Sequence, residues 1–397
     1  MRTTLLTILF LILYITTSSG MPDSLYYKLG SKGYELVLDM RYDEADEIFD
    51  EMIRMEPKNA VGYLYKSQCF FHCWQYTYLE PDKKTLKQFK SHLFKAKELA
   101  KEIPDKDDIE TQFILGSAYG NIGLYYANIN KWVRAFLNGR KGIRYIEKII
   151  KKDPEYSNAY FLLGMYNYYA ATLPKVVKSL SFLLGSAEGD REKGIEQLTH
   201  ASLSGDLKGD ARIFLADSVY YEEKDFEKAS ALLEKLTEEY PNNHYLRLIL
   251  AVSYRELIKY DQSAQVLISS LKSESLKEFP YLHGHTYFAL GVIYSRINEY
   301  DKAILAYENA YKIFKGLKGY IPDQHDALAL FEIGNAYEMM GAYDRACEYY
   351  SKIKQNKKNA YENARERMRN PLTPGQIKSI KDKNYLRYGR YYKAEKN

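Results

Sequence analysis

The fold is decided by the stretch from Tyr287 to Phe314, which reads YFALGVIYSRINEYDKAILAYENAYKIF. Its small and aromatic residues stand at regular intervals: Gly291, Tyr294, Tyr300, Ala303, Tyr307 and Ala310. The stretch from Leu330 to Tyr350, LFEIGNAYEMMGAYDRACEYY, repeats these intervals 43 residues further on, with Gly334, Tyr337, Tyr343, Ala346 and Tyr350. Recurrence of a pattern of this length indicates a repeat architecture in which each unit is a pair of packed elements.

Small residues at two fixed positions let two helices approach closely, and large residues between them fill the remaining space. The pattern resembles the tetratricopeptide repeat, a 34-residue pair of antiparallel helices. Three further copies begin at Tyr26, Asp210 and His244. Their matching residues are Gly33, Tyr42, Ala45, Phe49 and Pro57; Phe226, Ala229, Leu233, Leu236 and Pro241; and Ala251, Tyr254, Tyr260 and Leu267, with Ser263 in place of the usual Ala.

Weaker copies begin near Ala60, Ile109 and Ser157. In the copy at Ile109 both helices are expected to be about seven residues, or two turns, longer than usual. The copy at Ser157 has about 18 extra residues between its helices. The predicted fold class is therefore all-α, with about eight helical hairpins stacked into a right-handed superhelix, an α-solenoid, over residues 21–358. Residues 359–397 are predicted to form a C-terminal helix and a basic tail.

The first twenty residues, MRTTLLTILFLILYITTSSG, have the layout of a secretory signal peptide. Arg2 precedes an apolar run from Leu5 to Tyr14, and Ser18 and Gly20 stand at −3 and −1 from a cleavage site before Met21. A retained membrane anchor is the alternative, but a run of about ten residues is short of the roughly 20 needed to span a bilayer. The sequence predicts a signal peptide at 1–20 and a secreted or periplasmic mature chain, with attachment to the cell envelope as a variant.

Charge is unevenly distributed along the chain, whose formal net charge is +5. Residues 352–397 contain 14 Lys or Arg and 4 Asp or Glu, a net of +10, so the preceding residues carry −5. A basic tail could contact an anionic envelope surface, lipid headgroups or an acidic protein, and a solvated tail is the alternative. Nucleic acid is not expected as a partner of an exported chain.

The repeat beginning at Ser157 contains a second resemblance, in LLGMYNYYAATLPKVVKSLSFLLGSAEGDREKGIEQL from Leu162 to Leu198. It is similar to the signature region of the tetratricopeptide repeat protein 39 and inclusion body clearance protein family. The matching residues are Leu173, Pro174, Gly189, Asp190, Arg191 and Gly194. The resemblance implies a short apolar helix, about 173–185, inserted between two repeat helices. It also implies a mitochondrial outer-membrane or lipid-linked role, which the secretory signal contradicts.

No motif in the chain indicates catalysis: Walker loops, Ser-His-Asp elbows, HExxH and CxxC pairs are absent. The glycines of GSAYGNIG, Gly116–Gly123, are expected at helix-packing positions rather than around a nucleotide. His283 and His285 lack a third metal ligand. Cys69, His72 and Cys73 could bind Zn²⁺ from one helix face, but small core residues are the favoured reading and no disulfide is expected. We expect no enzyme, no cofactor and no metal.

Position 5 of the first helix faces the groove in this type of repeat, and here it is apolar: Phe113, Phe161, Phe214, Leu248, Phe288 and Phe331. The predicted partner-binding residues are Phe161, Tyr168, Phe214, Tyr221, Leu248, Arg255, Phe288, Phe331 and Asn335. A row of exposed Phe is unfavourable, because burying each ring is worth roughly 1.5–3 kcal/mol. The segment Leu173–Leu184 is predicted to cover the row near Phe161 and Phe214. Alternatively it lies at a membrane interface, or the Phe row packs between neighbouring helices.

The predicted function is a non-enzymatic scaffold that binds a protein or peptide partner in its concave groove. The alternative is a cell-envelope protein that binds glycan or lipid, since aromatic rings on a concave face can stack on sugars. The chain has only two tryptophans for that purpose, Trp74 and Trp132, and both are expected at core positions.

Overall fold

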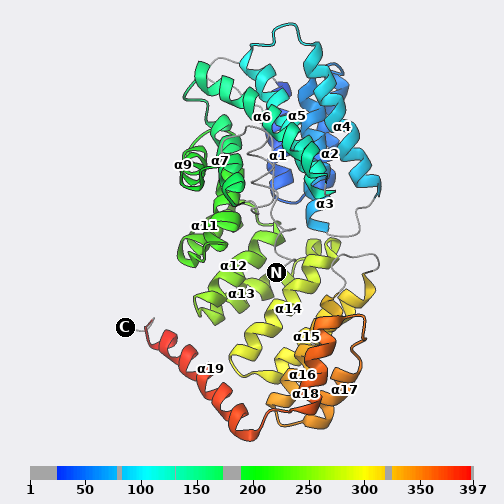
Figure 1. Cartoon of the computed structure of the whole chain (residues 1–397), viewed down its shortest axis with the longest axis vertical. Coiled ribbons are helices and arrows are strands. Elements are labelled where there is room, and N and C mark those ends of the chain that lie inside the picture. The colour runs from blue at the N-terminus through cyan, green and yellow to red at the C-terminus, as the bar shows by residue number, and fades with distance from the viewer. Residues whose placement is uncertain (1–24, 78–82, 130, 173–188, 318–323, 395–397) are drawn as a thin grey trace. The chain divides into compact units, whose positions relative to one another are not determined.

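The computed structural model describes residues 25–77, 83–129, 131–172, 189–317 and 324–394. These residues form helices joined by short turns, with no strand among them (Figure 1). The all-α fold class predicted from the sequence is confirmed, as is its α-solenoid construction from helical hairpins. The predicted signal peptide and the insertion 173–185 lie outside the described residues.

The chain divides into two compact units. Unit 1 comprises Met1–Trp74 and Asp82–Lys224, and unit 2 comprises Gln75–Pro81 and Asp225–Asn397. The helices of unit 1 are α1 (Leu25–Leu38), α2 (Tyr42–Met55), α3 (Ala60–Thr77), α4 (Lys83–Glu102), α5 (Ile109–Asn128), α6 (Trp132–Lys152), α7 (Ser157–Thr172), α9 (Arg191–Ala201), α10 (Lys208–Phe214) and the π-helical segment η1 (Leu215–Tyr221).

Unit 2 continues with α11 (Phe226–Glu239), α12 (His244–Glu256), α13 (Tyr260–Leu271), the 3₁₀ turn η2 (Glu274–Glu278), α14 (Pro280–Arg296), α15 (Tyr300–Gly316), α16 (His325–Met339), α17 (Tyr343–Ser351), α18 (Lys358–Arg369) and α19 (Pro374–Ala394). The predicted C-terminal helix is α18, which ends before the Pro371 that interrupts it. Much of the stretch that was predicted as a basic tail is helical, because it forms α19.

Close contact at the small residues holds each hairpin together, as the repeat pattern predicts. A Cβ added to Gly291 would lie 2.6 Å from the ring of Tyr307, and one added to Gly334 would lie 2.3 Å from the ring of Tyr350. On the second helices Ala303 and Ala346 have no exposed surface. The large aromatic ring of one helix therefore occupies the space that a side chain would need on the other.

The pair α5 and α6 shows the same device with glycine on both sides. These helices have 20 and 21 residues, which confirms the predicted two-turn extension. A Cβ on Gly142 would lie 2.6 Å from the carbonyl oxygen of Gly116, and one on Gly123 would lie 3.0 Å from the backbone nitrogen of Gly139. The glycines of Gly116–Gly123 therefore serve backbone-to-backbone packing along α5, as expected.

The Gly-Asp-Arg-x-x-Gly turn at the start of α9 fixes that helix against α7. A Cβ on Gly189 would lie 2.4 Å from the backbone nitrogen of Ala171, and one on Gly194 would lie 2.6 Å from that of Tyr168. Asp190 caps α9 by accepting a hydrogen bond from the Lys193 backbone N–H at 3.0 Å. Arg191 forms an ion pair with Glu223. Every matching residue of the turn therefore has a local structural task.

Candidate functional site

Three of the predicted groove residues of unit 1 are buried, which is expected both if the predicted insertion covers them and if the row packs between neighbouring helices. Phe161 is 0% exposed, Phe214 1% and Tyr168 5%. The Phe214 ring centroid lies 6.4 Å from that of Phe161 and 5.9 Å from that of Tyr168, so rings of neighbouring first helices contact each other. Phe113 is likewise buried, 5.5 Å from the ring of Tyr156. These ring contacts agree with packing of the Phe row between helices, and they leave the predicted cover over the same rings as a prediction.

Tyr168 has a second structural role that regular helix spacing could not reveal. Its hydroxyl donates a hydrogen bond to the carbonyl oxygen of Ser218 at 2.7 Å. Ser218 lies in the π-helical segment, where the regular i to i−4 bonding of the α-helix is interrupted. Tyr221 ends this segment and is half-buried. Counting repeat positions through it assumes an unbroken α-helix, which the chain does not have there. The predicted cover, Leu173–Leu184, lies outside the described residues and stays a prediction.

The predicted groove residues of unit 2 are partly accessible and lie on three successive first helices. Leu248 and Arg255 are on α12, Phe288 is on α14, and Phe331 and Asn335 are on α16; all five are half-buried. Phe288 packs 5.3 Å from Tyr307 and Phe331 packs 5.6 Å from Tyr350, between ring centroids. The second helices thus support one side of each ring. We call this surface, with the half-buried Val252 and Val292, the first-helix face of unit 2.

Charged side chains converge on the same face around the hydroxyl of Tyr307. Burial raises the pKa of Tyr307, the charge of Glu332 raises it further, and the charges of Arg296 and Arg255 oppose the rise. Burial also raises the pKa of Glu332, against a hydrogen bond from Asn335 and the charge of Arg296. The guanidinium of Arg255 also forms an ion pair with Glu256 at 2.6 Å. Arg255, Arg296 and Glu332 therefore all act on the Tyr307 hydroxyl.

The face ends near the end of α16 at Glu338, which is only 2% exposed. Its carboxylate accepts hydrogen bonds from Arg367 at 2.7 Å and from Tyr350 at 3.0 Å. It also accepts one from the backbone N–H of Leu372. A carboxylate with this many internal donors is committed to joining α16 to α18 and the residues that follow, so it is not available to a partner.

Helix α19 packs on the turn between α14 and α15. Asn384 donates to the Asn298 side-chain oxygen at 3.1 Å, and Lys381 lies 5.5 Å from the centroid of the Tyr300 ring. Leu372 and Ile377 pack against the core cluster that contains Tyr300. The first part of α19 is therefore an ordered component of unit 2.

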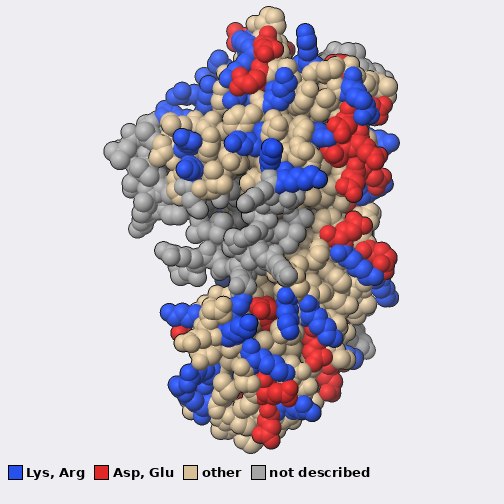
Figure 2. Space-filling view, turned by 90° about the vertical axis from the view of Figure 1, so that its right-hand side faces the viewer, with Lys and Arg blue, Asp and Glu red and all other residues tan. Residues whose placement is uncertain are grey.

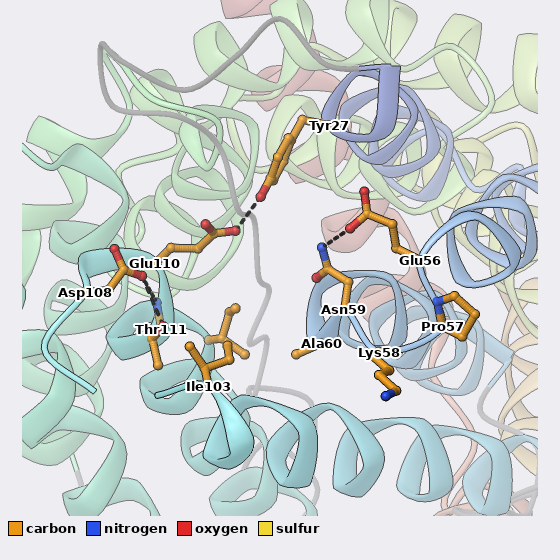
Figure 3. A pocket seen from close by; sticks show the side chains of 11 residues that line it. Tyr27, Glu56, Pro57, Lys58, Asn59, Ala60, Ile103, Asp108, Glu110 and Thr111 are labelled. Atoms are coloured by element: carbon orange, nitrogen blue, oxygen red, sulfur yellow. Dashed lines mark hydrogen bonds between the residues drawn. The ribbon is translucent and has the colours of Figure 1, made fainter. Parts of the chain in front are cut away.

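A pocket of about 710 Å³ opens in unit 1 (Figure 3). Tyr27 of α1, the turn Glu56–Ala60 and the start of α5 line it. The Tyr27 hydroxyl donates to Glu110 at 2.7 Å, and burial raises the pKa of Glu110. Glu56 accepts from Asn59, and Asp108 accepts from the Thr111 backbone N–H as the cap of α5. These hydrogen bonds account for all three carboxylates as parts of the turns that they stabilise.

The residues considered as metal ligands are arranged as packing residues. Cys69 is buried and donates to the carbonyl oxygen of Tyr42 at 3.4 Å, and His72 lies edge-on to the Tyr34 ring at 6.3 Å. The described part of the chain holds no group of three or more His, Cys, Asp or Glu suited to a metal ion. Its three cysteines are not paired with one another. Within the same residues, no helix has the length and apolar character needed to cross a bilayer.

Trp132 is a further residue whose position differs from the expectation. Trp132, expected in the core, is 44% exposed at the start of α6, with Val133 and Leu137 exposed beside it. Trp132 is the first residue of α6, and with this exposure it is not a core residue. The sequence does show closely spaced apolar residues, Trp132, Val133 and Leu137. Which of them are exposed depends on where the helix starts, and the sequence does not fix that position.

Comparison with known proteins identifies the repeats. A family model described as tetratricopeptide repeat matches residues 218–243 and 328–359, and a second model of the same description matches 286–313. No curated protein matches the chain. The resemblance of Leu162–Leu198 to the tetratricopeptide repeat protein 39 and inclusion body clearance family gains no support from these comparisons.

Several solved structures resemble the chain at low identity. Pseudomonas aeruginosa pilF is 17% identical over 64% of this chain and 98% of its own, with a TM-score of 0.41. Yeast Tom70 is 12% identical over 90% of this chain and 99% of its own, with a TM-score of 0.40. A tetratricopeptide repeat protein from Parabacteroides merdae is 14% identical over 77% of this chain and 98% of its own, with a TM-score of 0.34. With its helical hairpins and the family-model matches between residues 218 and 359, this chain contains tetratricopeptide repeats.

Proposed function

We propose that this chain is a non-enzymatic scaffold that binds a protein or peptide partner on the first-helix face of unit 2. The observation that carries the proposal is the contrast between the two predicted rows. The aromatic residues of unit 1 are buried, whereas Leu248, Phe288 and Phe331 keep part of their surface accessible on three successive helices. Covering half-buried apolar side chains with a partner lowers the free energy of the complex. Because the second helices already support these rings, binding costs little side-chain conformational entropy.

The charges on this face specify the partner further. Arg255 and Arg296 both lie near Tyr307 beside the apolar row; Arg255 pairs with Glu256, and Glu338 is committed to internal hydrogen bonds. We therefore propose an extended or helical segment with apolar side chains and an acidic group. Arginine can bind a carboxylate through two parallel hydrogen bonds, which would fix the orientation of the segment.

Site-specific photocrosslinking in the native cell tests this proposal. A photoreactive residue at Val292, on the face, is expected to form an adduct with one protein partner. The same residue at Leu305, which is 61% exposed on the second helix α15 of the same hairpin, is expected to form none. The substitutions R255E and R296E should remove the adduct, whereas R345E, at an exposed site on α17, should preserve it. Equal adducts from Val292 and Leu305, or none from Val292 and Val252, would overturn the proposal.

We further propose that the mature chain begins near Met21 outside the cytosol, because residues 1–20 have the layout of a secretory signal. N-terminal sequencing of the protein recovered from its cells tests this. A chain that starts near Met21 in the exported fraction supports export, and a chain with Met1 intact in the cytosol contradicts it. This outcome is independent of the partner-binding test.

A further inference from the structure

The beginning of α6 exposes a group of large apolar side chains to solvent. Trp132 is 44% exposed, Val133 55% and Leu137 51%, and Ile129, just before the helix, is 36% exposed. Val133 and Leu137 are four residues apart and so lie on the same face of the helix. Single exposed apolar residues are ordinary, but four within nine residues form a contiguous patch that calls for a partner. We call this group the α6 patch.

Helix α6, which carries the α6 patch, and helix α4 are rich in cations and poor in acids. Helix α6 contains seven Lys or Arg and one acid, Glu147. The first fifteen residues of α4 contain six Lys and no acid. In Figure 2, Lys and Arg are spread over the upper part of the visible surface, and Asp and Glu form one group near the top and another at the right-hand margin. The excess of cations is therefore local to the helices α4 and α6.

Aromatic rings connect the cations of α4 to those of α6. Lys90 of α4 lies 5.7 Å from the ring centroid of Tyr125, and Arg134 of α6 lies 5.5 Å from that of Tyr126. The two tyrosine rings are 5.4 Å apart at the end of α5. Lys90, Tyr125, Tyr126 and Arg134 thus form a continuous basic and aromatic strip that ends beside the α6 patch.

We propose that this edge of unit 1 docks on an anionic membrane surface. The side chains of the α6 patch would enter the boundary between headgroups and acyl chains, and Lys90, Lys131 and Arg134 would bind the headgroup phosphates. Trp and Tyr favour this depth because their rings are apolar and their polar groups remain hydrated. Lys and Arg extend apolar stems while their charges stay at the surface. The combination of protruding apolar residues and cations is what interfacial binding to anionic lipid requires.

Two other partner classes fit the patch less well. A single-stranded nucleic acid would use the cations and stack on Trp132 and the tyrosines, but Val133 and Leu137 offer it neither stacking nor hydrogen bonds. An acidic protein segment would match the cations. It would not explain the four exposed apolar side chains unless the segment also had an apolar face. Both are therefore included as competing outcomes of the test.

Vesicle cosedimentation of the purified full chain tests the proposal. The chain is expected to bind vesicles of phosphatidylcholine mixed with phosphatidylglycerol more tightly than vesicles of phosphatidylcholine alone, and added salt should weaken the binding. The substitution L137D should reduce binding at least about tenfold, because burial of one Leu side chain is worth a factor of that order. L203D, at a site 77% exposed outside the patch in the same unit, is the matched control and should bind as the unchanged chain does.

Charge reversal and fluorescence provide independent readouts. The pair K131E and R134E should lower binding at least about tenfold, since each cation near an anionic surface contributes about a factor of five, whereas K235E with K272E, at exposed sites of unit 2, should not. In a W74F background, emission from Trp132 should shift to the blue on binding. Absence of binding to anionic vesicles, equal binding by L137D and L203D, or capture of a single-stranded oligonucleotide or an acidic peptide without vesicle binding would overturn the proposal.

Discussion

At the scale of single residues, the high tyrosine content is explained by packing rather than by ligand recognition. The chain has 40 Tyr, and many of the buried rings place their hydroxyls on internal acceptors. Tyr168 donates to a carbonyl of the π-helical segment, Tyr34 donates to Asp210 at 3.2 Å, and Tyr350 donates to Asn335 at 2.8 Å. The ring of such a tyrosine fills the space between two helices, and its hydroxyl donates a hydrogen bond to a group on a different helix. One side chain can thus link helices that are distant in sequence.

The contact between Tyr34 and Asp210 predicts an unusual pH dependence. Burial raises the pKa of Asp210 well above its ordinary value of 3.8. The folded chain then holds a proton that the unfolded chain releases, so the free energy of unfolding falls by about 1.4 kcal/mol per pH unit above 3.8 until the folded pKa is passed. Asp210→Asn removes this loss and keeps an acceptor for Tyr34. We expect the free energy of unfolding of D210N, measured with urea, to rise relative to that of the unchanged chain as the pH is raised from 5 to 8.

Two variants make this test specific. Asp210→Ala leaves the Tyr34 hydroxyl without this acceptor, and it should destabilise unit 1 by about 1–3 kcal/mol at pH 5. Asp344→Asn, at an exposed position of α17, should show no comparable gain with pH. A constant difference between D210N and the unchanged chain from pH 5 to pH 8 would show that Asp210 does not retain a proton in the fold.

At the scale of elements, glycine decides how closely α5 and α6 approach, and these helices lie side by side in Figure 1. Gly142 and Gly139 are on the same helix and differ only in their surroundings. A Cβ on Gly142 would lie 2.6 Å from the carbonyl oxygen of Gly116, whereas one on Gly139 would meet nothing within 4 Å. Backbone atoms cannot move aside as a flexible side chain can, so the two positions should respond to Ala in opposite directions.

We expect Gly142→Ala to lower the free energy of unfolding by about 1–3 kcal/mol, because the two helices must separate. Gly139→Ala should leave it unchanged or raise it by about 0.5–1 kcal/mol, because Ala is favoured over Gly inside a helix. Thermal unfolding of the two variants in parallel measures both effects. If G142A proved as stable as G139A, the helices would not approach each other as closely as described.

The histidine contact between α14 and α16 should make unit 2 sensitive to acid. The ring of His285 lies 4.5 Å from that of His325 and 4.2 Å from that of Tyr281, between ring centroids. Burial, together with the charge of His325, lowers the pKa of His285 well below 6.5. A lowered folded pKa means that stability is complete above pH 6.5 and is lost as the pH falls below 6.5, by about 1.4 kcal/mol per unit.

Replacing this histidine with phenylalanine isolates the effect, since Phe keeps the ring packing and cannot be protonated. When the pH is lowered from 7.5 to 5, the free energy of unfolding of His285→Phe should rise by about 2 kcal/mol relative to that of the unchanged chain, as measured by urea unfolding. His200→Phe, at an exposed site on α9, serves as the control. A difference between H285F and the unchanged chain that does not vary with pH would assign the acid sensitivity to other groups.

At the scale of the whole molecule, the sequence predicted the hairpins because their determinants are local. Gly291, Ala303 and Tyr307 meet within one repeat, so their spacing alone specifies the contact. The site was predicted less well because it depends on contacts between repeats. Phe161 and Phe214 contact each other although they are 53 positions apart in sequence. The π-helical segment also shifts the count of positions after Phe214. Exposure of Trp132 likewise follows from where α6 starts, which the repeat pattern does not fix.

The division into two units makes a prediction about how damage spreads. Ala303 is fully buried between α15 and its neighbours, where its core cluster includes Ile304, Ile333 and Ala336. Ala303→Leu should overpack this contact and cost about 1–3 kcal/mol. In a repeat array each hairpin is stabilised mainly by its nearest neighbours, so the loss should spread to adjacent hairpins and fade with distance.

Hydrogen exchange of the full chain measures this spread element by element. In the A303L variant we expect faster exchange in α14–α17, a smaller increase in α12 and α13, and unchanged protection in α5 and α6 of unit 1, which belong to a separate compact unit. Leu305→Ala, a change at a site 61% exposed on the same helix, is the control and should leave exchange unaltered throughout. Equal loss of protection in α5, α6 and α15 would mean that the chain unfolds as one cooperative body, and unchanged exchange in α15 would mean that Ala303 does not lie at a close contact.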